Sequence, residues 1–262
     1  MKSYGLIIEP VVIGKDWVAG TDLSIQNFRG EQIIQPDGQW IDWLPEAEPQ
    51  SPYGFESSAC ASFGTLNAVE ILLRRVYGEI ENFSDRFLAK MSGTTPNGNS
   101  VQTVAETLKY KGVVKETFWP YTPDLNTWDK YYSDIPQNVR TMAVGEFAEY
   151  EFKHEYVPTY PTMLMSHLRY SPLGISVSAW NKGPDGLYLS TPYNNHWVVL
   201  IGYVKDKWWI VYDTYADDGI YLKRLVWNYN FQIAKKYSIK VQVSNPSAFT
   251  RFLKQLQVWL GL

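Results

Sequence analysis

The hydrophobic pattern of this chain changes after residues 171–172, and this change constrains the fold more than any other feature. Segments with helical spacing or helix-capping signals come first, and they are 57–77, 84–92, 100–110 and 162–170. Short apolar runs typical of strands come later, at 175–179, 197–203, 207–212, 219–225 and 237–243. A strand region is also expected to begin within 141–152. Helices followed by strands predict an α+β protein with a helical half and a sheet half.

Length, charge and cysteine content limit the broad class. The 262 residues allow one large domain or two small ones. A net charge of -3 leaves no electrostatic footprint for nucleic acid, so no such partner is expected. No run approaches the ~20 apolar residues that span a bilayer, and Glu9 and Pro10 come too early for a signal peptide. One cysteine without a leader fits a reducing compartment, so we expect a cytoplasmic or virion-associated protein.

The last segment, 246–262, differs in character from the rest of the chain. It contains no acidic residue, and its apolar side chains share one helical face: Phe249, Phe252, Leu253, Leu256, Trp259 and Leu260. We therefore expect an amphipathic C-terminal helix over 246–262, separate from a single domain over 1–245. A protein surface or a membrane surface is the expected partner of its apolar face.

The single cysteine, Cys60, stands where a run of small residues meets a strong helical segment. A thiol in the first turn of a helix lies in the partial positive charge of the helix N-terminus, which favours the thiolate. Downstream, His196 precedes a predicted strand, and Asp213 ends the next one. A nucleophile, a base and an orienting carboxylate in that order indicate nucleophilic catalysis by cysteine.

Several further motifs extend this pattern from about Trp40 to Leu225, and together they resemble the papain-like cysteine peptidases. The segment 58–63 resembles the surroundings of that family's nucleophile, and 97–100 with 119–122 resembles its glycine loop and Tyr-Pro-Tyr stretch. Asn195-His196 is similar to the histidine strand of the family. His196 follows Cys60 by 136 residues and Asp213 follows it by 153, close to the ~130–150 of papain-type enzymes. Sequences with this motif set look similar to papain-like proteins encoded by bacteria and their phages.

The resemblance implies a two-lobed fold: a helical lobe over about 50–140 with a central helix, and an antiparallel sheet or barrel over about 141–245, with the N-terminal segment crossing over. It also implies a peptide or protein substrate and no cofactor. The Cys60 thiolate would attack an amide carbonyl, and His196 would keep it ionised and later protonate the leaving amine. Asp213 would fix the imidazole ring. The implied substrate-binding residues are Asn97, Gly98, Ala179, Asn195, Trp197 and Tyr215.

The chain also departs from the family pattern. Ala61 replaces the tryptophan that usually follows the nucleophile, Asp213 replaces the more common asparagine, and Tyr215 replaces a tryptophan. The family's oxyanion glutamine lies six residues before the cysteine, a position that Gly54 occupies here. Gln50, ten residues before Cys60, is the nearest upstream candidate for this role.

Three functional hypotheses remain at this point. The first is a cysteine endopeptidase, the second a peptidoglycan-directed amide hydrolase, and the third a catalytically silent papain-like structural or virion component. The enzyme hypotheses expect an open cleft between the two halves, with the Cys60 sulfur within ~4 Å of a His196 ring nitrogen. A pair closed off from solvent would count against catalysis. No propeptide of recognisable length precedes Trp40, so no zymogen step is expected, and no His/Cys cluster suggests a metal site.

Overall fold

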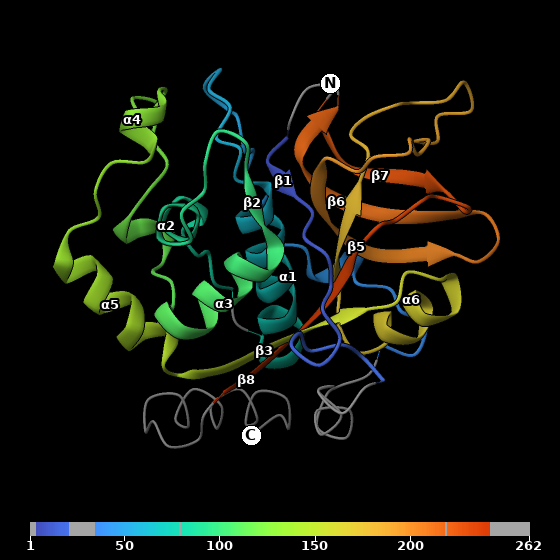
Figure 1. Ribbon diagram of the computed structural model, residues 1–262, viewed down its shortest axis with the longest axis horizontal. Coiled ribbons are helices and arrows are strands. Elements are labelled where there is room, and N and C mark those ends of the chain that lie inside the picture. Colours follow the sequence, from blue (N-terminus) through green and yellow to red (C-terminus); the bar gives the residue numbers. More distant parts are fainter. Residues whose placement is uncertain (1–3, 21–34, 79, 218, 242–262) are drawn as a thin grey trace, which may run out of the picture.

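The computed structural model describes residues 4–20, 35–78, 80–217 and 219–241, and it divides into a helical lobe and a sheet lobe (Figure 1). The helical lobe holds α1 (Cys60–Tyr77), α2 (Asp85–Met91), α3 (Val101–Lys111), α4 (Trp128–Tyr131) and α5 (Gln137–Phe147), with the 3-10 turns η2 (Ile41–Trp43) and η3 (Glu116–Phe118) beside them. The predicted α+β, two-lobed architecture is confirmed. The helix predicted over 246–262 lies outside the described residues.

The sheet lobe is one antiparallel sheet of six strands, with α6 (Pro161–Leu168) packed against it. The strands are β3 (Tyr150–Val157), β4 (Leu173–Val177), β5 (His196–Val204), β6 (Trp208–Asp217), β7 (Ile220–Val226) and β8 (Ala234–Val241). Their order across the sheet is β3-β8-β4-β5-β6-β7. The central position of β5 gives its residues neighbours on both edges and on α1.

Helix α1 is the core of the molecule, because its first fourteen residues, Cys60 to Leu73, are all buried. It ends at Gly78, whose left-handed backbone (φ 66°) lets its N–H cap the Arg74 carbonyl. Gly64 permits close packing on β5, since a Cβ there would lie 2.7 Å from the Trp197 ring. The helix that carries the cysteine and the strand that carries the histidine are thus held in direct contact.

The two helices after α1 begin at serine caps. The Ser84 hydroxyl accepts the Phe87 N–H of α2 at 3.2 Å, and the Ser100 hydroxyl accepts the Thr103 N–H of α3 at 3.1 Å. Each cap satisfies one of the N–H groups that a helix start leaves unpaired. These starts agree with the sequence prediction to within one residue.

The strand expected to begin within 141–152 is β3, which begins at Tyr150, while α5 occupies the earlier part of this range up to Phe147. Strand β3 carries charged side chains that are nevertheless buried. Glu155 forms an ion pair with Lys236 of β8, and His154 Nδ1 lies 3.0 Å from Lys235 Nζ. These polar groups satisfy one another only after β3 and β8 pair, so an apolar pattern could not have marked this strand.

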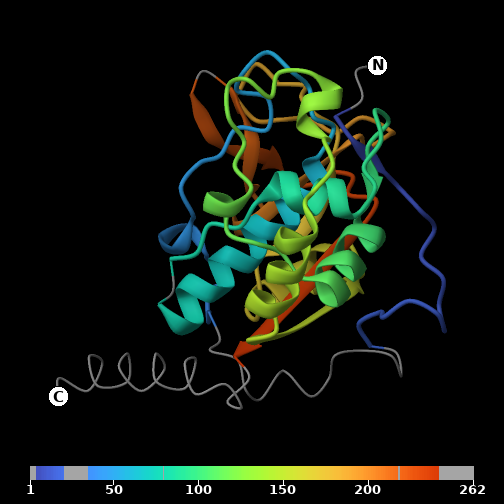
Figure 2. The same cartoon turned by 90° about the vertical axis from the view of Figure 1, so that its left-hand side faces the viewer.

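The N-terminal segment runs along the boundary between the lobes (Figures 1 and 2). Its short strand β1 (Leu6–Ile7) pairs in parallel with β2 (Asn99–Ser100), just before α3. The segment then follows the outside of the molecule, where Val18 bridges to Tyr156 of β3. Residues close to the start of the chain therefore lie between elements that come much later in the sequence.

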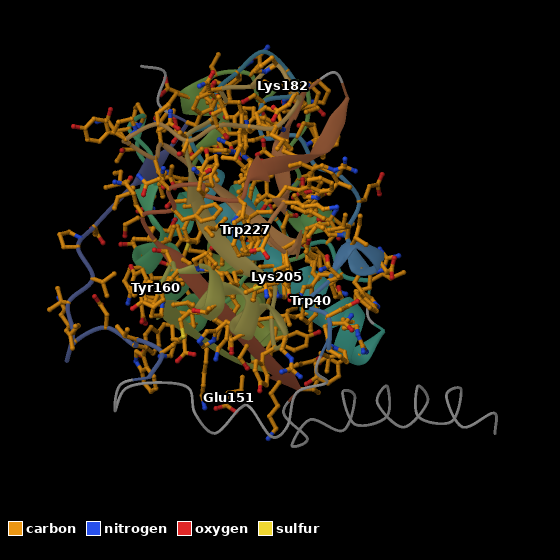
Figure 3. The ribbon with its side chains drawn as sticks, turned by 90° about the vertical axis from the view of Figure 1, so that its right-hand side faces the viewer. Trp40, Glu151, Tyr160, Lys182, Lys205 and Trp227 are labelled. Carbon is orange, nitrogen blue, oxygen red and sulfur yellow. The ribbon has the colours of Figure 1, made fainter. Side chains whose placement is uncertain are left out.

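The outer side of the sheet lobe is rich in aromatic residues. The Trp209 and Trp227 rings stack with centroids 4.4 Å apart, and Trp209 Nε1 donates to the Trp227 carbonyl at 2.9 Å. Figure 3 views this side and shows Trp227 near its middle, with Lys182 toward one end and Glu151 toward the other. In the described part of the chain, no helix combines the length and apolar character needed to cross a membrane.

Candidate active site

Cys60 is the first residue of α1, so its backbone N–H has no acceptor within the helix. The turn before it is tight, because Ser58 adopts a left-handed backbone (φ 53°) that non-glycine residues rarely take. This turn delivers the sulfur to the start of β5, where the Trp197 backbone N–H hydrogen-bonds to it. The thiol is thereby placed beside the residue that follows the histidine.

The thiol is fully buried in this conformation (0% exposed). Burial raises the pKa of the Cys60 thiol well above its ordinary value, against the lowering effect of the Trp197 N–H. The negative charges of Glu56 and Asp213 raise the pKa further. Burial and these charges therefore favour the protonated thiol over the thiolate.

His196 opens β5 and is held by Asp213 of β6. Its Nε2 lies 2.6 Å from Asp213 Oδ1, and both side chains are 0% exposed. The other ring nitrogen, Nδ1, has no hydrogen-bond partner among the described residues. Because the carboxylate occupies Nε2, Nδ1 is the nitrogen left to exchange a proton with a thiol.

A hydrogen bond between the thiol and the imidazole is not formed in this conformation. The hydrogen bonds to the Cys60 sulfur come from the backbone N–H groups of Trp197 and Ala61, and His196 Nδ1 has no hydrogen-bond partner within the described ranges. The expectation of a cleft open to solvent is wrong for this conformation, because both side chains are fully buried. The structure brings the three candidate catalytic residues to one place, in a closed arrangement.

The Asp213 carboxylate accepts four hydrogen bonds, two on each oxygen. Oδ1 receives His196 Nε2 and the Thr214 N–H (2.7 Å), and Oδ2 receives Trp180 Nε1 (2.8 Å) and Lys223 Nζ (2.9 Å). Burial raises the pKa of Asp213, but the charges and hydrogen bonds of His196 and Lys223 outweigh it and hold this pKa below its usual value. Asp213 is therefore an ionised carboxylate in a fixed orientation.

Gln50 lies in this neighbourhood, but its amide is already engaged. Its Nε2 donates to Glu56 Oε1 at 3.0 Å, and its Oε1 accepts the Thr214 hydroxyl at 3.3 Å. Glu56 also accepts the Ser58 N–H at 3.0 Å and the Tyr215 hydroxyl at 2.5 Å. Glu56 thus connects Gln50, Ser58 and Tyr215 beside Cys60 by hydrogen bonds, a role that the sequence analysis missed.

The chain's own N-terminal segment covers the site. The Tyr4 ring lies 5.6 Å from the His196 ring and 5.3 Å from the Tyr215 ring, measured between centroids. Next to it, a Cβ on Gly5 would come within 2.2 Å of the Ser58 carbonyl oxygen. A Cβ on Gly98 would come within 1.9 Å of the Gly5 oxygen. Two glycines therefore allow this segment to lie directly against the turn that precedes Cys60.

The remaining predicted substrate-binding residues fall into two groups. Tyr215 packs on His196 with ring centroids 5.1 Å apart, and Asn195 Oδ1 accepts the Ala179 N–H at 2.9 Å, so these three lie close to the histidine. Asn97 is exposed in the turn before Gly98. The prediction that Trp197 binds substrate is wrong for its side chain, which is 0% exposed and packs in the core.

In the described ranges, no group of three or more His, Cys, Asp or Glu side chains is arranged to hold a metal ion. Lys223 and Trp180 complete the surroundings of Asp213, yet neither was a sequence candidate. The only signal for Lys223 was its place in a predicted strand, ten residues after Asp213.

Comparisons with known proteins bear on the fold. No family model matches the sequence, and no curated protein matches it. Solved structures of papain-like cysteine proteases do match. Digestive procathepsin L 3 from the larval midgut of Tenebrio molitor has 18% identity and a TM-score of 0.57, over 76% of this chain and 68% of that chain.

Two further matches come from a plant and a bacterium. Bromelain from Ananas comosus has 17% identity and a TM-score of 0.55, over 76% of this chain and 97% of its own. The cysteine protease and lectin-like domains of Cwp84, a surface-layer-associated protein of Clostridium difficile, have 12% identity and a TM-score of 0.64, over 81% of this chain and 54% of theirs. At these identities the likeness establishes the papain-like fold, and the bacterial or phage origin stays a prediction.

Proposed function

We propose that this chain, which has the papain-like fold, is a cysteine peptidase that hydrolyses peptide bonds through Cys60 and His196. The observation that carries this proposal is the 2.6 Å contact of His196 Nε2 with Asp213 at the strand end beside the sulfur. It leaves Nδ1 as the proton acceptor and fixes the ring with an ionised carboxylate. Such a base and a thiol at a helix N-terminus are the parts that thiolate catalysis requires.

The reaction would proceed in two balanced stages. The Cys60 thiol gives its proton to His196 Nδ1, and the thiolate forms a bond to the carbonyl carbon of the peptide. The His196 imidazolium then protonates the leaving amine as the C–N bond breaks, which leaves an acyl-enzyme. Water, deprotonated by His196, attacks the acyl carbon and releases the acid and the thiol. The Cys60 backbone N–H is available to the oxyanion.

Activity requires that the N-terminal segment leave the site. In the closed conformation the thiol is buried and its pKa is raised, so neither substrate nor a proton acceptor reaches it. Displacement of residues 4–7 would hydrate the sulfur and remove the Tyr4 ring from the His196 ring. Opening would thus both expose the nucleophile and favour its ionisation.

A catalytically silent protein of the same fold is the second candidate, and a specific observation favours it. Cys60 and His196 are both 0% exposed, and the Glu56 charge adds to the effect of burial in opposing a thiolate. In that case the buried thiol is a small core side chain, and the closed site is the permanent state of the molecule.

Labelling with a thiol-directed epoxide separates the two candidates. The inhibitor E-64, which is bound in the bromelain structure, is incubated with the full chain at neutral pH, and the adduct is located by peptide mapping. The peptidase proposal expects modification of Cys60, with His196→Ala slowing it by ~10²–10⁴-fold. Casein cleavage should be lost in Cys60→Ser. If neither the wild type nor Gly5→Ala, a change that disfavours the closed N-terminal segment, forms an adduct or cleaves casein, the result supports the catalytically silent protein.

A further inference from the structure

We propose that Lys223 is a positioning residue that balances the charge of Asp213, so that the two together orient His196 as a neutral amide would. The inference rests on the proposed peptidase function and names the group that controls the protonation of its base. The resemblance suggested asparagine as the more common residue at this position, and this chain carries a charged one. The structure supplies the opposite charge on the next strand.

The geometry of the three side chains carries the inference. Asp213 of β6 faces His196 with Oδ1 (2.6 Å) and Lys223 of β7 with Oδ2 (2.9 Å). The carboxylate therefore bridges the Lys223 amino group and a ring that gains a charge only when protonated. All three side chains are at most 1% exposed, so water screens none of these interactions.

Lys223 is held in the protein rather than extending to solvent. Its Nζ also donates to the Tyr215 carbonyl, and it lies 5.0 Å from the centre of the Trp180 ring. That ring in turn donates its Nε1 proton to the same carboxylate oxygen. A lysine usually extends its ammonium to water, and burial of an ion costs several kcal/mol unless it is paired. Asp213 is the partner that makes this placement stable.

The charge balance decides how tightly His196 holds its second proton. With Lys223 present, the Asp213–Lys223 pair has no net charge, and the carboxylate still accepts the Nε2 proton. Without Lys223, the buried carboxylate has only His196 as a counterion, which would stabilise the imidazolium strongly. An imidazolium held in this way protonates a leaving amine poorly. The other ionisable groups at the site are the Cys60 thiol, Glu56 and the Tyr4 and Tyr215 phenols.

Three variants test the balance. Lys223→Met removes the cation and keeps a long apolar stem, so His196 should keep its second proton to a higher pH. Asp213→Asn leaves Lys223 without its counterion, so His196 should lose that proton at a lower pH. The double variant Asp213→Asn/Lys223→Met is neutral at both positions and should return to wild-type behaviour. The double variant also keeps the test valid if a single variant fails to fold, because it leaves no buried charge unpaired.

A matched control exists elsewhere in the sheet. Lys236 and Glu155 form another ion pair with both side chains nearly fully buried, between β8 and β3. Lys236→Met should cost stability, as the loss of a buried partner does, without altering His196. A general loss of packing can therefore be distinguished from a specific electrostatic effect.

The readout is the titration of His196, followed by NMR of 15N-labelled histidine rings in the full-length protein and assigned with a His196→Gln variant. We expect the midpoint to rise by ~1–3 pH units in Lys223→Met and to fall in Asp213→Asn. In the double variant the His196 midpoint should lie within about half a pH unit of the wild-type midpoint, which is less than the shift that a close charge produces. In Lys236→Met the His196 midpoint should equal that of the wild type. An unchanged midpoint in Lys223→Met, or a double variant that behaves as either single one, would overturn the proposal.

This titration does not require catalysis, so the two proposals can fail separately. If the midpoints move as expected and no peptide is cleaved after the site is opened, the charge balance stands and the peptidase proposal falls. If peptides are cleaved and the midpoints do not move, Lys223 has only a structural role. Where both hold, the pH profile of kcat should shift in Lys223→Met and recover in the double variant.

Discussion

The ring of Tyr4 lies 5.6 Å from the imidazole ring of His196, so a residue near the start of the chain closes the site formed by the fifth strand. The sequence predicted no propeptide of recognisable length before Trp40 and no zymogen step, and it did not predict this contact. This contact turns the accessibility of Cys60 into a measurable property of the N-terminal segment.

Gly5→Ala should open the site. Gly5 has φ 96°, and a Cβ would lie 2.2 Å from the Ser58 carbonyl oxygen, so alanine is unfavourable in the closed conformation. A backbone strain of ~1–3 kcal/mol against that conformation should speed iodoacetamide modification of native Cys60 by ~5- to ~150-fold.

Gly14→Ala is the control for this opening. Gly14 has a similar backbone angle (φ 88°), but nothing lies within 4 Å of the position of its Cβ. Gly14→Ala therefore has the backbone cost of a positive φ, as Gly5→Ala does, but its new Cβ contacts no residue of the site. Equal modification rates in wild type, Gly5→Ala and Gly14→Ala would show that the segment does not govern access.

Glu56→Gln should make the thiol ionise at lower pH. Burial is the main cause of the raised Cys60 pKa, and the Glu56 charge adds to it. Removal of that charge lowers the pKa, so the midpoint of the alkylation rate against pH should move downward in the Gly5→Ala background, where the sulfur is accessible. Glu46→Gln, an exposed change on the same loop, should leave the midpoint in place. If Glu56→Gln and Glu46→Gln give the same midpoint of alkylation rate against pH, the Glu56 charge does not influence the ionisation of Cys60 and Glu56 has only a structural role.

Gly64→Ala should destabilise the contact between the two lobes. Its Cβ would meet the Trp197 ring at 2.7 Å, so α1 or β5 must shift, at a cost of ~1–3 kcal/mol in the free energy of unfolding. Gly145→Ala, in the last turn of α5 with nothing within 4 Å of the new Cβ, should instead be neutral or stabilising by up to ~1 kcal/mol. Urea titration of both variants measures the difference, and equal stabilities would contradict this account of the packing.

His154 should make the folded protein less stable in mild acid. Burial, followed by the charge of Lys235, lowers the pKa of His154 to about 4. The unfolded chain therefore binds more protons between pH ~4 and ~6.5, and the free energy of unfolding should decrease by up to about 3 kcal/mol as pH falls through this range. His154→Gln should reduce that decrease. Lys153→Gln, half-buried on the same strand, should retain the wild-type dependence on pH.

The elements that sequence could predict are those marked by local signals. The serine caps of α2 and α3 and the glycine after α1 fix helix ends within a few residues, and their partners lie three or four positions away. The start of strand β3 was predicted only to within 141–152, because its buried charges are balanced by Lys235 and Lys236, about eighty residues further along the chain. No local pattern contains that balance.

The same distinction applies to the candidate site. Cys60, His196 and Asp213 could be proposed from residue type, order and spacing. Lys223 and Glu56 could not, because a charged residue in a strand or loop ordinarily indicates solvent and only the fold brings these two to the site. Tyr4 also could not be proposed from the sequence. It reaches the site because β1, the next element along the chain, pairs with β2 through two residue pairs, and only the fold shows this pairing.

The pairing of β1 with β2, and of Tyr4 with residues of β5 and β6, has a consequence for biosynthesis. Tyr4 leaves the ribosome long before His196 and Tyr215 are translated, so its ring has no place to dock until the sheet lobe has been made. Contacts of such large separation in sequence form late. Each newly synthesised molecule therefore passes through a stage in which Cys60 has been made and Tyr4 is not yet docked beside the site.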